Sequence, residues 1–201
     1  MTVTQTKGCE AKTFPHLKGL DGISDQTLEQ HIKLYQGYVN NVNTLTEKLG
    51  AFISSGNVGS PEYAELKRRV GFEVNGVILH DLYFSNLKPH GGTLDKSSKL
   101  YKQIVEQFGS YENWEADFKA TGMMRGIGWA IMYHCTQSGH LINLWIGEHE
   151  IGHPAGSNPV MIMDVWEHAY VSDHTPTGRK AYIDAFFKNI NWQEIENRLL
   201  K

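Results

Sequence analysis

Apolar side chains recur every three or four residues in two long stretches of the first half of the chain, which is the spacing of one face of an α-helix. The first stretch follows Ser24, a favourable N-cap, and ends at Gly50. The second begins at Pro61, where proline suits the first turn of a helix, and runs to about Leu87. Because only a short polar loop separates them, the two helices should form an antiparallel hairpin. Residues 1–23 show no such periodicity and are expected to form an extended arm on the surface.

The helical pattern stops at Pro89, Gly91 and Gly92, which mark a domain boundary near residue 90. Beyond this point the pattern predicts helices at 95–108, 111–121, 178–188 and 192–200, and strands at 129–135, 141–147 and 159–166. The sequence therefore predicts an α+β fold: an N-terminal antiparallel α-helical hairpin domain (1–90), followed by an α+β domain (91–201) with a three-stranded antiparallel sheet.

Composition and charge narrow the classes of function. The chain has 201 residues, 40% of them hydrophobic and 20% charged, which suits one ordinary globular protein with a sizeable core. A formal net charge of -3 without a run of lysine and arginine argues against a protein that binds nucleic acid or a membrane surface. No segment approaches the roughly 18 apolar residues of a membrane span. Cys9 and Cys135 fit neither a disulfide framework nor a thiolate metal site, which favours a reducing, cytoplasmic location.

The candidate chemistry lies in residues 160–170. An apolar run that is typical of a buried strand ends at Asp164, and His168 follows four residues later. Oxygen and nitrogen donors on a rigid support suit an ion such as manganese, iron or zinc. The same spacing also occurs in purely structural hydrogen-bonded pairs, so a metal site requires further histidines. Two are available, because His31 and His80 lie on the apolar stripes of the two predicted hairpin helices.

A second motif points elsewhere. Residues 149–153 match H-E-x-x-H, the zinc-protease pattern, in which both histidines and the glutamate must share one stable helix. Here Gly147, Gly152, Pro154 and Gly156 crowd the segment and disfavour a helix. The motif therefore does not predict a protease.

The letters D-x-W-E-H-A-Y at 164–170 resemble the C-terminal motif of the iron/manganese superoxide dismutases, and matching residues extend over roughly 12–200. Further matches are Gly126-Ile127-Gly128-Trp129 and Asn191-Trp192. In that family the first half of the chain supplies two histidine ligands, one from each hairpin helix, and the second half supplies an aspartate and a histidine. The resemblance therefore implies one mononuclear metal site per chain, formed by His31, His80, Asp164 and His168.

The resemblance also implies an enzyme, a superoxide dismutase that converts two superoxide anions to dioxygen and hydrogen peroxide by redox cycling of one iron or manganese ion. Three neutral imidazoles and one carboxylate suit an ion that cycles between the divalent and trivalent states. The residues around the ligands follow neither the usual iron nor the usual manganese pattern, so the metal stays open, with iron slightly favoured. One alternative is a redox-inactive metal-binding member of the same fold, and another is a helical-hairpin interaction protein without metal.

In this family protons pass through metal-bound solvent, a glutamine or histidine, and a tyrosine at the channel mouth. By resemblance, His149 is the expected partner of the solvent, because Gly76 leaves the alternative glutamine position without a side chain. Tyr38 is the expected channel tyrosine. It lies seven residues beyond His31, where the family commonly has eight, so Tyr35 stays open as an alternative.

Two further expectations come from the resemblance. Trp129 and Trp166 should form an aromatic shell that keeps the site dry, although Ile78 and Phe84 stand where the family usually has tryptophan. Glu167 should reach across a two-fold axis to His168 of the partner subunit, which implies a homodimer or a higher homo-oligomer.

Overall fold

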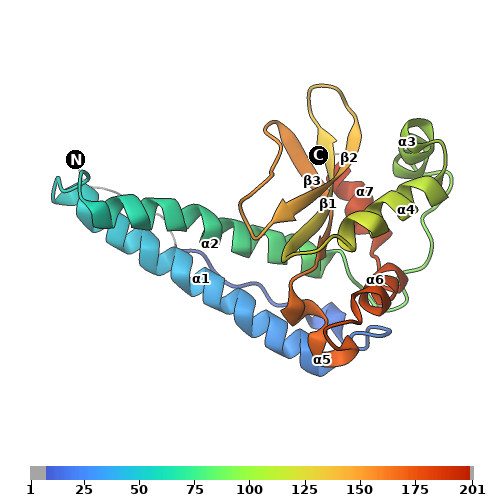
Figure 1. Ribbon diagram of the computed structural model, residues 1–201, viewed down its shortest axis with the longest axis horizontal. Coiled ribbons are helices and arrows are strands. Elements are labelled where there is room, and N and C mark those ends of the chain that lie inside the picture. Colours follow the sequence, from blue (N-terminus) through green and yellow to red (C-terminus); the bar gives the residue numbers. More distant parts are fainter. Residues whose placement is uncertain (1–7, 200–201) are drawn as a thin grey trace.

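The computed structural model describes residues 8–199, and its first half is a pair of long helices (Figure 1). Helix α1 spans Asp25–Ser54 and α2 spans Pro61–Ser85, and they pack side by side as the predicted antiparallel hairpin. Each follows a serine N-cap whose hydroxyl oxygen accepts a backbone N–H bond at 3.1 Å. This bond satisfies one of the amide groups that a helix leaves free at its N-terminus.

Helix α1 continues beyond Gly50, where the sequence pattern predicts its end. A glycine inside a helix costs only about 1 kcal/mol relative to alanine. The last turn still packs on α2, where the ring centroids of Phe52 and Tyr63 lie 6.1 Å apart. The predicted stop is therefore wrong, because packing against the partner helix offsets the cost of the glycine.

The N-terminal arm is the clearest departure from the predicted fold. Its apolar side chains are buried rather than on the surface, with exposures of 2–8%: Phe14, Leu17, Leu20 and Ile23. The short 3-10 helix η1, Pro15–Leu17, lies in this arm, and Leu17 is its buried residue. The Phe14 ring packs on Phe84 and Tyr35, with centroids 4.8 and 5.7 Å apart. The expectation of a surface arm is therefore wrong for these four apolar residues, whereas the six residues between them are exposed. Residues 1–7 lie outside the described part of the chain.

The second half of the chain forms an α+β domain. Its elements are α3 (Lys99–Phe108), α4 (Tyr111–Gly122), β1 (Gly128–Cys135), β2 (Leu141–Gly147), β3 (Ser157–Asp164), η2 (Glu167–Ala169), α5 (Val171–His174), α6 (Arg179–Lys188) and α7 (Trp192–Leu199). The strands form one antiparallel sheet in the order β2-β1-β3. The predicted fold class is thus confirmed.

Some boundaries in this half differ from the prediction. Helix α3 begins four residues later than expected because Ser98 is its N-cap, whereas Asp95 accepts the Ser97 backbone N–H at 2.8 Å in the turn before it. Strand β3 ends at Asp164, two residues early, because the chain leaves the sheet there and enters η2 and α5. These two elements are only three and four residues long, which is too short for a periodic pattern to reveal.

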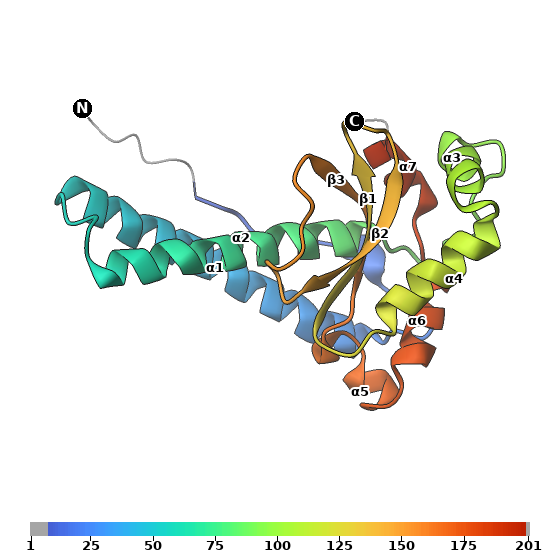
Figure 2. The ribbon, with the colours of Figure 1, turned by 45° about the horizontal axis from the view of Figure 1, so that its top comes forward.

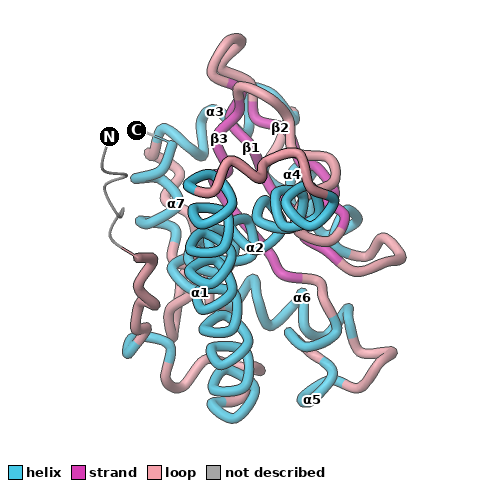
Figure 3. Tube along the Cα trace, turned by 90° about the vertical axis from the view of Figure 1, so that its left-hand side faces the viewer, coloured by secondary structure: helices cyan, strands magenta, loops and turns pink. Residues whose placement is uncertain are grey.

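The sheet stands over one end of the hairpin. Figures 1 and 2 show that the loop end of α1 and α2 projects away, while the sheet lies above the later turns of α2. Seen from the loop end, the strands lie in the upper part of the molecule and α5 and α6 in the lower part (Figure 3). Strand β3 contacts α2 and α7, and α4 covers β1 and β2. Within residues 8–199, no helix combines the length and the apolarity that crossing a membrane requires.

A buried asparagine ties the hairpin to the sheet. Asn86, the C-cap of α2, is fully buried; its amide NH₂ donates to the Ile162 carbonyl of β3, and its amide oxygen accepts from the Arg198 guanidinium of α7. Because each buried polar group needs its partner, these bonds restrain the last turns of α2 relative to the end of β3. Both elements carry residues of the candidate site.

Candidate metal centre

Four side chains that are far apart in the sequence converge between the hairpin and the sheet. One donor atom from each lies within 4.8 Å of the others, and together they form what we call the His/Asp cluster: His31, His80, Asp164 and His168. One carboxylate oxygen is the hub. Asp164 Oδ2 lies 3.0, 3.3 and 3.7 Å from the Nε2 atoms of His31, His168 and His80. The structure thus brings together all four residues that the sequence singled out.

Regular elements position the cluster. His31 lies on α1 and His80 on α2, each on the buried face of its helix, with exposures of 1% and 0%. Asp164 is the last residue of β3, and its second oxygen, Oδ1, accepts the Trp166 backbone N–H at 2.8 Å. This bond fixes the carboxylate so that Oδ2 faces the imidazoles. His168 follows on η2, and 21% of its side chain is exposed.

One imidazole in the cluster presents an unsatisfied lone pair. His80 Nδ1 lies 2.6 Å from the Gly76 carbonyl oxygen. A carbonyl only accepts hydrogen bonds, so Nδ1 carries the proton and Nε2 has its lone pair free. That atom is buried and has no hydrogen-bond partner among the described residues. An unpaired buried acceptor is costly, and a cation at the centre of the cluster would satisfy it.

The electrostatics of the cluster also suit a cation. Burial lowers the pKa of His31 and lowers that of His80 well below its ordinary value. Burial alone would raise the pKa of Asp164, but attraction and hydrogen bonding by His168 and His31 outweigh it and leave this pKa below its ordinary value. The two helix-borne imidazoles are therefore neutral and the carboxylate is ionised near pH 7, which is the protonation state that metal binding requires.

Tyr38 and His149 form a hydrogen-bonded pair beside the cluster. His149 is fully buried, and its Nε2 lies 2.8 Å from the Tyr38 hydroxyl oxygen. Its Nδ1 accepts from the Trp129 indole N–H at 3.0 Å. Because an indole only donates, the neutral His149 ring carries its proton on Nε2 and donates to the Tyr38 oxygen. The phenol proton of Tyr38 is then free for another acceptor.

Both members of this pair keep the protonation that the hydrogen bonds need. Burial lowers the pKa of His149 to about 4. Burial, followed by the negative charges of Asp164 and Glu73, raises the pKa of Tyr38 to about 12. At neutral pH the imidazole is therefore neutral and the phenol is protonated.

The alternative tyrosine faces another way. Tyr35 is fully buried, and its hydroxyl oxygen accepts the Lys12 backbone N–H of the arm at 2.8 Å. The contact with His149 belongs to Tyr38, and Gly76 makes room for it. A Cβ atom added at Gly76 would lie 2.6 Å from Tyr38 Cδ1. The Tyr38 ring thus occupies the space that a side chain at position 76 of α2 would fill.

Aromatic rings surround the cluster. The ring centroids of Trp129 and His80 lie 5.0 Å apart, and those of Trp166 and His168 lie 5.8 Å apart in a stacked pair. These contacts agree with the expected aromatic shell. Phe72, which was not predicted from the sequence, also belongs to this shell, and its ring lies 4.5 Å from that of His149. Its place eight residues before His80, on the same face of α2, was the available signal.

The H-E-x-x-H segment is not a helix. Residues 148–150 form a turn, Ile151 forms an isolated β-bridge with Gly147, and Glu148 has a left-handed backbone with φ of 51°. His149 points into the protein and pairs with Tyr38, as described above. The expectation that this segment is not a helix is confirmed.

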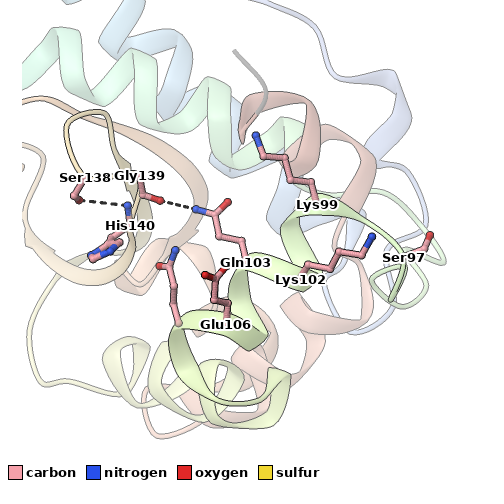
Figure 4. Close-up of a pocket in the computed structure, with 9 residues that line it drawn as sticks. Ser97, Lys99, Lys102, Gln103, Glu106, Ser138, Gly139 and His140 are labelled. Atoms are coloured by element: carbon pink, nitrogen blue, oxygen red, sulfur yellow. Dashed lines mark hydrogen bonds between the residues drawn. The ribbon is translucent and has the colours of Figure 1, made fainter.

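A separate surface pocket of about 680 Å³ lies between α3 and the β1–β2 turn (Figure 4). Its lining is polar and includes Lys99, Lys102 and His140. Gln103 Nε2 donates across it to the Gly139 carbonyl at 2.6 Å. Because no residue of the His/Asp cluster lines this pocket, it is not part of the candidate metal centre.

Comparison with known proteins gives matches over most of the chain. Residues 20–88 match the α-hairpin domain of the iron/manganese superoxide dismutases, and residues 96–198 match their C-terminal domain. A manganese superoxide dismutase of Haloferax volcanii is 38% identical over 173 residues, which cover 86% of this chain and 84% of the relative. An iron superoxide dismutase of Aquifex pyrophilus is 39% identical over 193 residues, covering 92% and 89%. An iron superoxide dismutase of Cupriavidus metallidurans is 36% identical over 185 residues, covering 89% of each.

Proposed function

Because this chain belongs to the iron/manganese superoxide dismutase family and is therefore an oxidoreductase that acts on superoxide, we propose that the His/Asp cluster holds its single catalytic metal ion. The observation that carries this proposal is the convergence of three imidazoles and one carboxylate, in which the buried Nε2 of His80 has no hydrogen-bond partner. Nitrogen and oxygen donors of this kind suit iron and manganese. When bound, either ion supplies a redox couple that takes an electron from one superoxide and gives it to a second.

The protein must supply two protons for each hydrogen peroxide formed. We propose that Tyr38 and His149 deliver them. His149 donates to the Tyr38 oxygen, so the phenol proton points away from His149 and can be given to an acceptor beside the cluster. His149 is buried, whereas Tyr38 is half-buried, so the pair leads from the interior of the protein toward its surface. This intact pair argues against the redox-inactive alternative.

We propose iron as the preferred metal. Relatives named for iron and for manganese are about equally similar to this chain, and the relative with the longest of the three aligned stretches is an iron enzyme. The test is to remove the metal, reload the protein separately with iron and with manganese, and measure both metal content and superoxide dismutation. Iron-loaded protein should be the more active. Equal or higher activity with manganese would contradict the preference.

We propose that the active protein is a homodimer formed around Glu167 and His168. Glu167 is exposed, and His168 Nδ1 has no hydrogen bond within residues 8–199, so it is available to a partner subunit. Three residues after Glu167, the Tyr170 hydroxyl accepts from Arg179 at 3.3 Å. Arg179 also donates to the Met124 and Gly126 carbonyls, in a loop whose Met123 and Met124 side chains are 46% and 49% exposed. Exposed apolar side chains of this kind suit a buried interface.

Sedimentation and metal analysis of Glu167→Ala test this assembly. The proposal predicts a weaker dimer and a lower metal content, because an acidic partner for His168 would orient the ring that carries a ligand atom. A Glu167→Ala protein that stays dimeric and fully metallated would contradict it.

We also propose a cytoplasmic location, because both Cys9 and Cys135 are unpaired, as in proteins of reducing compartments.

The domain boundary near residue 90 is likewise a proposal. Limited proteolysis that cleaves first within 88–98 would support it, and first cleavage inside α2 would contradict it.

A further inference from the structure

Two hydrogen-bond donors converge on the backbone carbonyl of His149. Asn75 Nδ2, from α2, donates to this oxygen at 2.7 Å. His153 Nε2, from the turn that follows His149, lies 2.9 Å from the same atom. Because a carbonyl only accepts, the His153 ring carries its proton on Nε2. His153, the second histidine of the H-E-x-x-H motif, therefore donates a hydrogen bond to the backbone of His149, the first.

A third residue, Tyr133, fixes the orientation of the His153 ring. With its proton on Nε2, His153 has a free lone pair on Nδ1, and the Tyr133 hydroxyl lies 2.7 Å away and donates to it. Tyr133 belongs to β1, the central strand, and is 2% exposed. The chain of bonds thus runs from the rigid sheet through His153 to the backbone of His149.

The turn needs such a restraint. Glu148, directly before His149, has φ of 51°, a left-handed backbone that residues other than glycine adopt rarely and at a cost. The His149 ring must nonetheless satisfy Trp129 at one nitrogen and Tyr38 at the other, at 3.0 and 2.8 Å. A small rotation of the backbone would break at least one of these bonds, because their geometry tolerates little change.

We propose that His153, oriented by Tyr133, is a positioning residue that holds the His149 ring in its bonds to Trp129 and Tyr38. His153 belongs to neither the His/Asp cluster nor the Tyr38–His149 pair, and it acts through the backbone of His149. The inference rests on the proposed role of His149 in proton delivery. His153, the second histidine of the H-E-x-x-H motif, thus has a positioning role that involves no contact with a metal ion.

The test replaces His153 by residues of similar size. His153→Leu removes the donor, whereas His153→Gln keeps an amide NH₂ for the His149 carbonyl and an amide oxygen for the Tyr133 hydroxyl. We expect His153→Leu to keep its metal but to lose about 10- to 100-fold in kcat, the usual cost of losing a supporting partner. KM should change less, and the midpoint potential of the metal should shift. His153→Gln should restore most of kcat and the original potential, and crystal structures should show the His149 ring displaced only in His153→Leu.

The matched control is His140→Leu, which removes an exposed imidazole on the β1–β2 turn and should leave kcat and midpoint potential unchanged. Tyr133→Phe provides a milder variant that removes only the hydroxyl. It should shift kcat and the potential in the same direction as His153→Leu, and it decides the question if His153→Leu does not fold.

Two outcomes would overturn the inference, and His149→Leu separates them. In the first outcome, His149→Leu loses kcat, but metallated His153→Leu keeps the wild-type kcat, midpoint potential and His149 ring position. Only the role of His153 is then wrong. Tyr133→Phe serves for the same comparison if His153→Leu does not fold. If His149→Leu itself keeps the wild-type kcat and potential, the proposed role of His149 fails, and the inference fails with it.

Discussion

The His/Asp cluster and the Tyr38–His149 pair lie next to each other but are built differently. Three donors of the cluster sit on α1, α2 and the end of β3, and Asn86 ties α2 to β3. The pair instead joins a helix to a turn with a left-handed residue, across 111 positions of sequence. The cluster is therefore held mainly by regular elements that are bonded to each other, whereas His149 of the pair lies in an irregular turn. Changes at the pair should alter catalysis while the metal remains bound.

The largest effect at the pair is expected for Gly76→Ala. The new Cβ would lie 2.6 Å from a carbon of the rigid Tyr38 ring, so the tyrosine must move away from His149. We expect kcat to fall by about 10- to 100-fold, as for other displacements of positioned groups, with metal content unchanged. Steady-state kinetics and metal analysis of the purified variant measure both quantities.

Gly71→Ala is the matched control. It lies on the same helix, and an added Cβ would meet nothing within 4 Å. This variant should keep the wild-type kcat and gain up to about 1 kcal/mol in the free energy of unfolding. Gly76→Ala with a wild-type kcat would show that the position of Tyr38 does not govern turnover.

A smaller effect is expected for Tyr38→Phe, which removes the hydroxyl and leaves the ring in place. We expect a roughly tenfold loss of kcat, because a water molecule can replace part of a proton relay. Tyr35→Phe is the comparison, since its hydroxyl accepts the Lys12 backbone N–H of the arm instead of contacting His149. It should keep kcat and lose about 1 kcal/mol of stability. The reverse result, with Tyr35→Phe impaired and Tyr38→Phe active, would exchange their roles.

The buried imidazole of His149 should also make the free energy of unfolding depend on pH. Its pKa is about 4 in the folded protein, and an imidazole in an unfolded chain has a pKa near 6.5. Unfolding therefore takes up a proton between these values. The stability contributed by neutral His149 is fully present above about pH 6.5, declines as the pH falls, and is lost below about pH 4.

Urea unfolding of wild type and His149→Gln from pH 4 to 8 measures this contribution. The wild-type free energy of unfolding should fall relative to that of His149→Gln by about 3 kcal/mol over this range. A difference between the two proteins that does not change with pH would mean that His149 is not neutral and buried in solution.

The same contrast explains which features the sequence revealed. The sequence pattern placed each of the four cluster residues on the apolar stripe of a helix, at the end of an apolar strand or one turn beyond it. That the four act together was implied only by the resemblance to the iron/manganese superoxide dismutases. Helix starts were equally readable, from Ser24, whose hydroxyl caps α1, and from Pro61, the first residue of α2. The domain boundary near residue 90 stays a prediction.

The missed features depend on contacts that local patterns do not encode. The arm was expected on the surface, but Phe14 and Leu17 are buried because the hairpin and the arm pack together. The hydrogen bonds from Asn75 and His153 to the His149 carbonyl were not predicted, because His149 lies in a turn that has no periodic pattern. Gly76 was recognised as a missing side chain, but the ring that fills the gap comes from the other helix.

The central claim is that the His/Asp cluster binds the metal ion on which dismutation depends, and His80→Ala tests it most directly. His80 is fully buried, and its free Nε2 points at no other partner among the described residues. The purified variant, compared with a His140→Ala control, should contain less than about a tenth of the wild-type iron plus manganese, since the remaining donors bind too weakly. It should also have no measurable dismutase activity in a cytochrome reduction assay. Metal content and activity equal to those of the control would contradict the account.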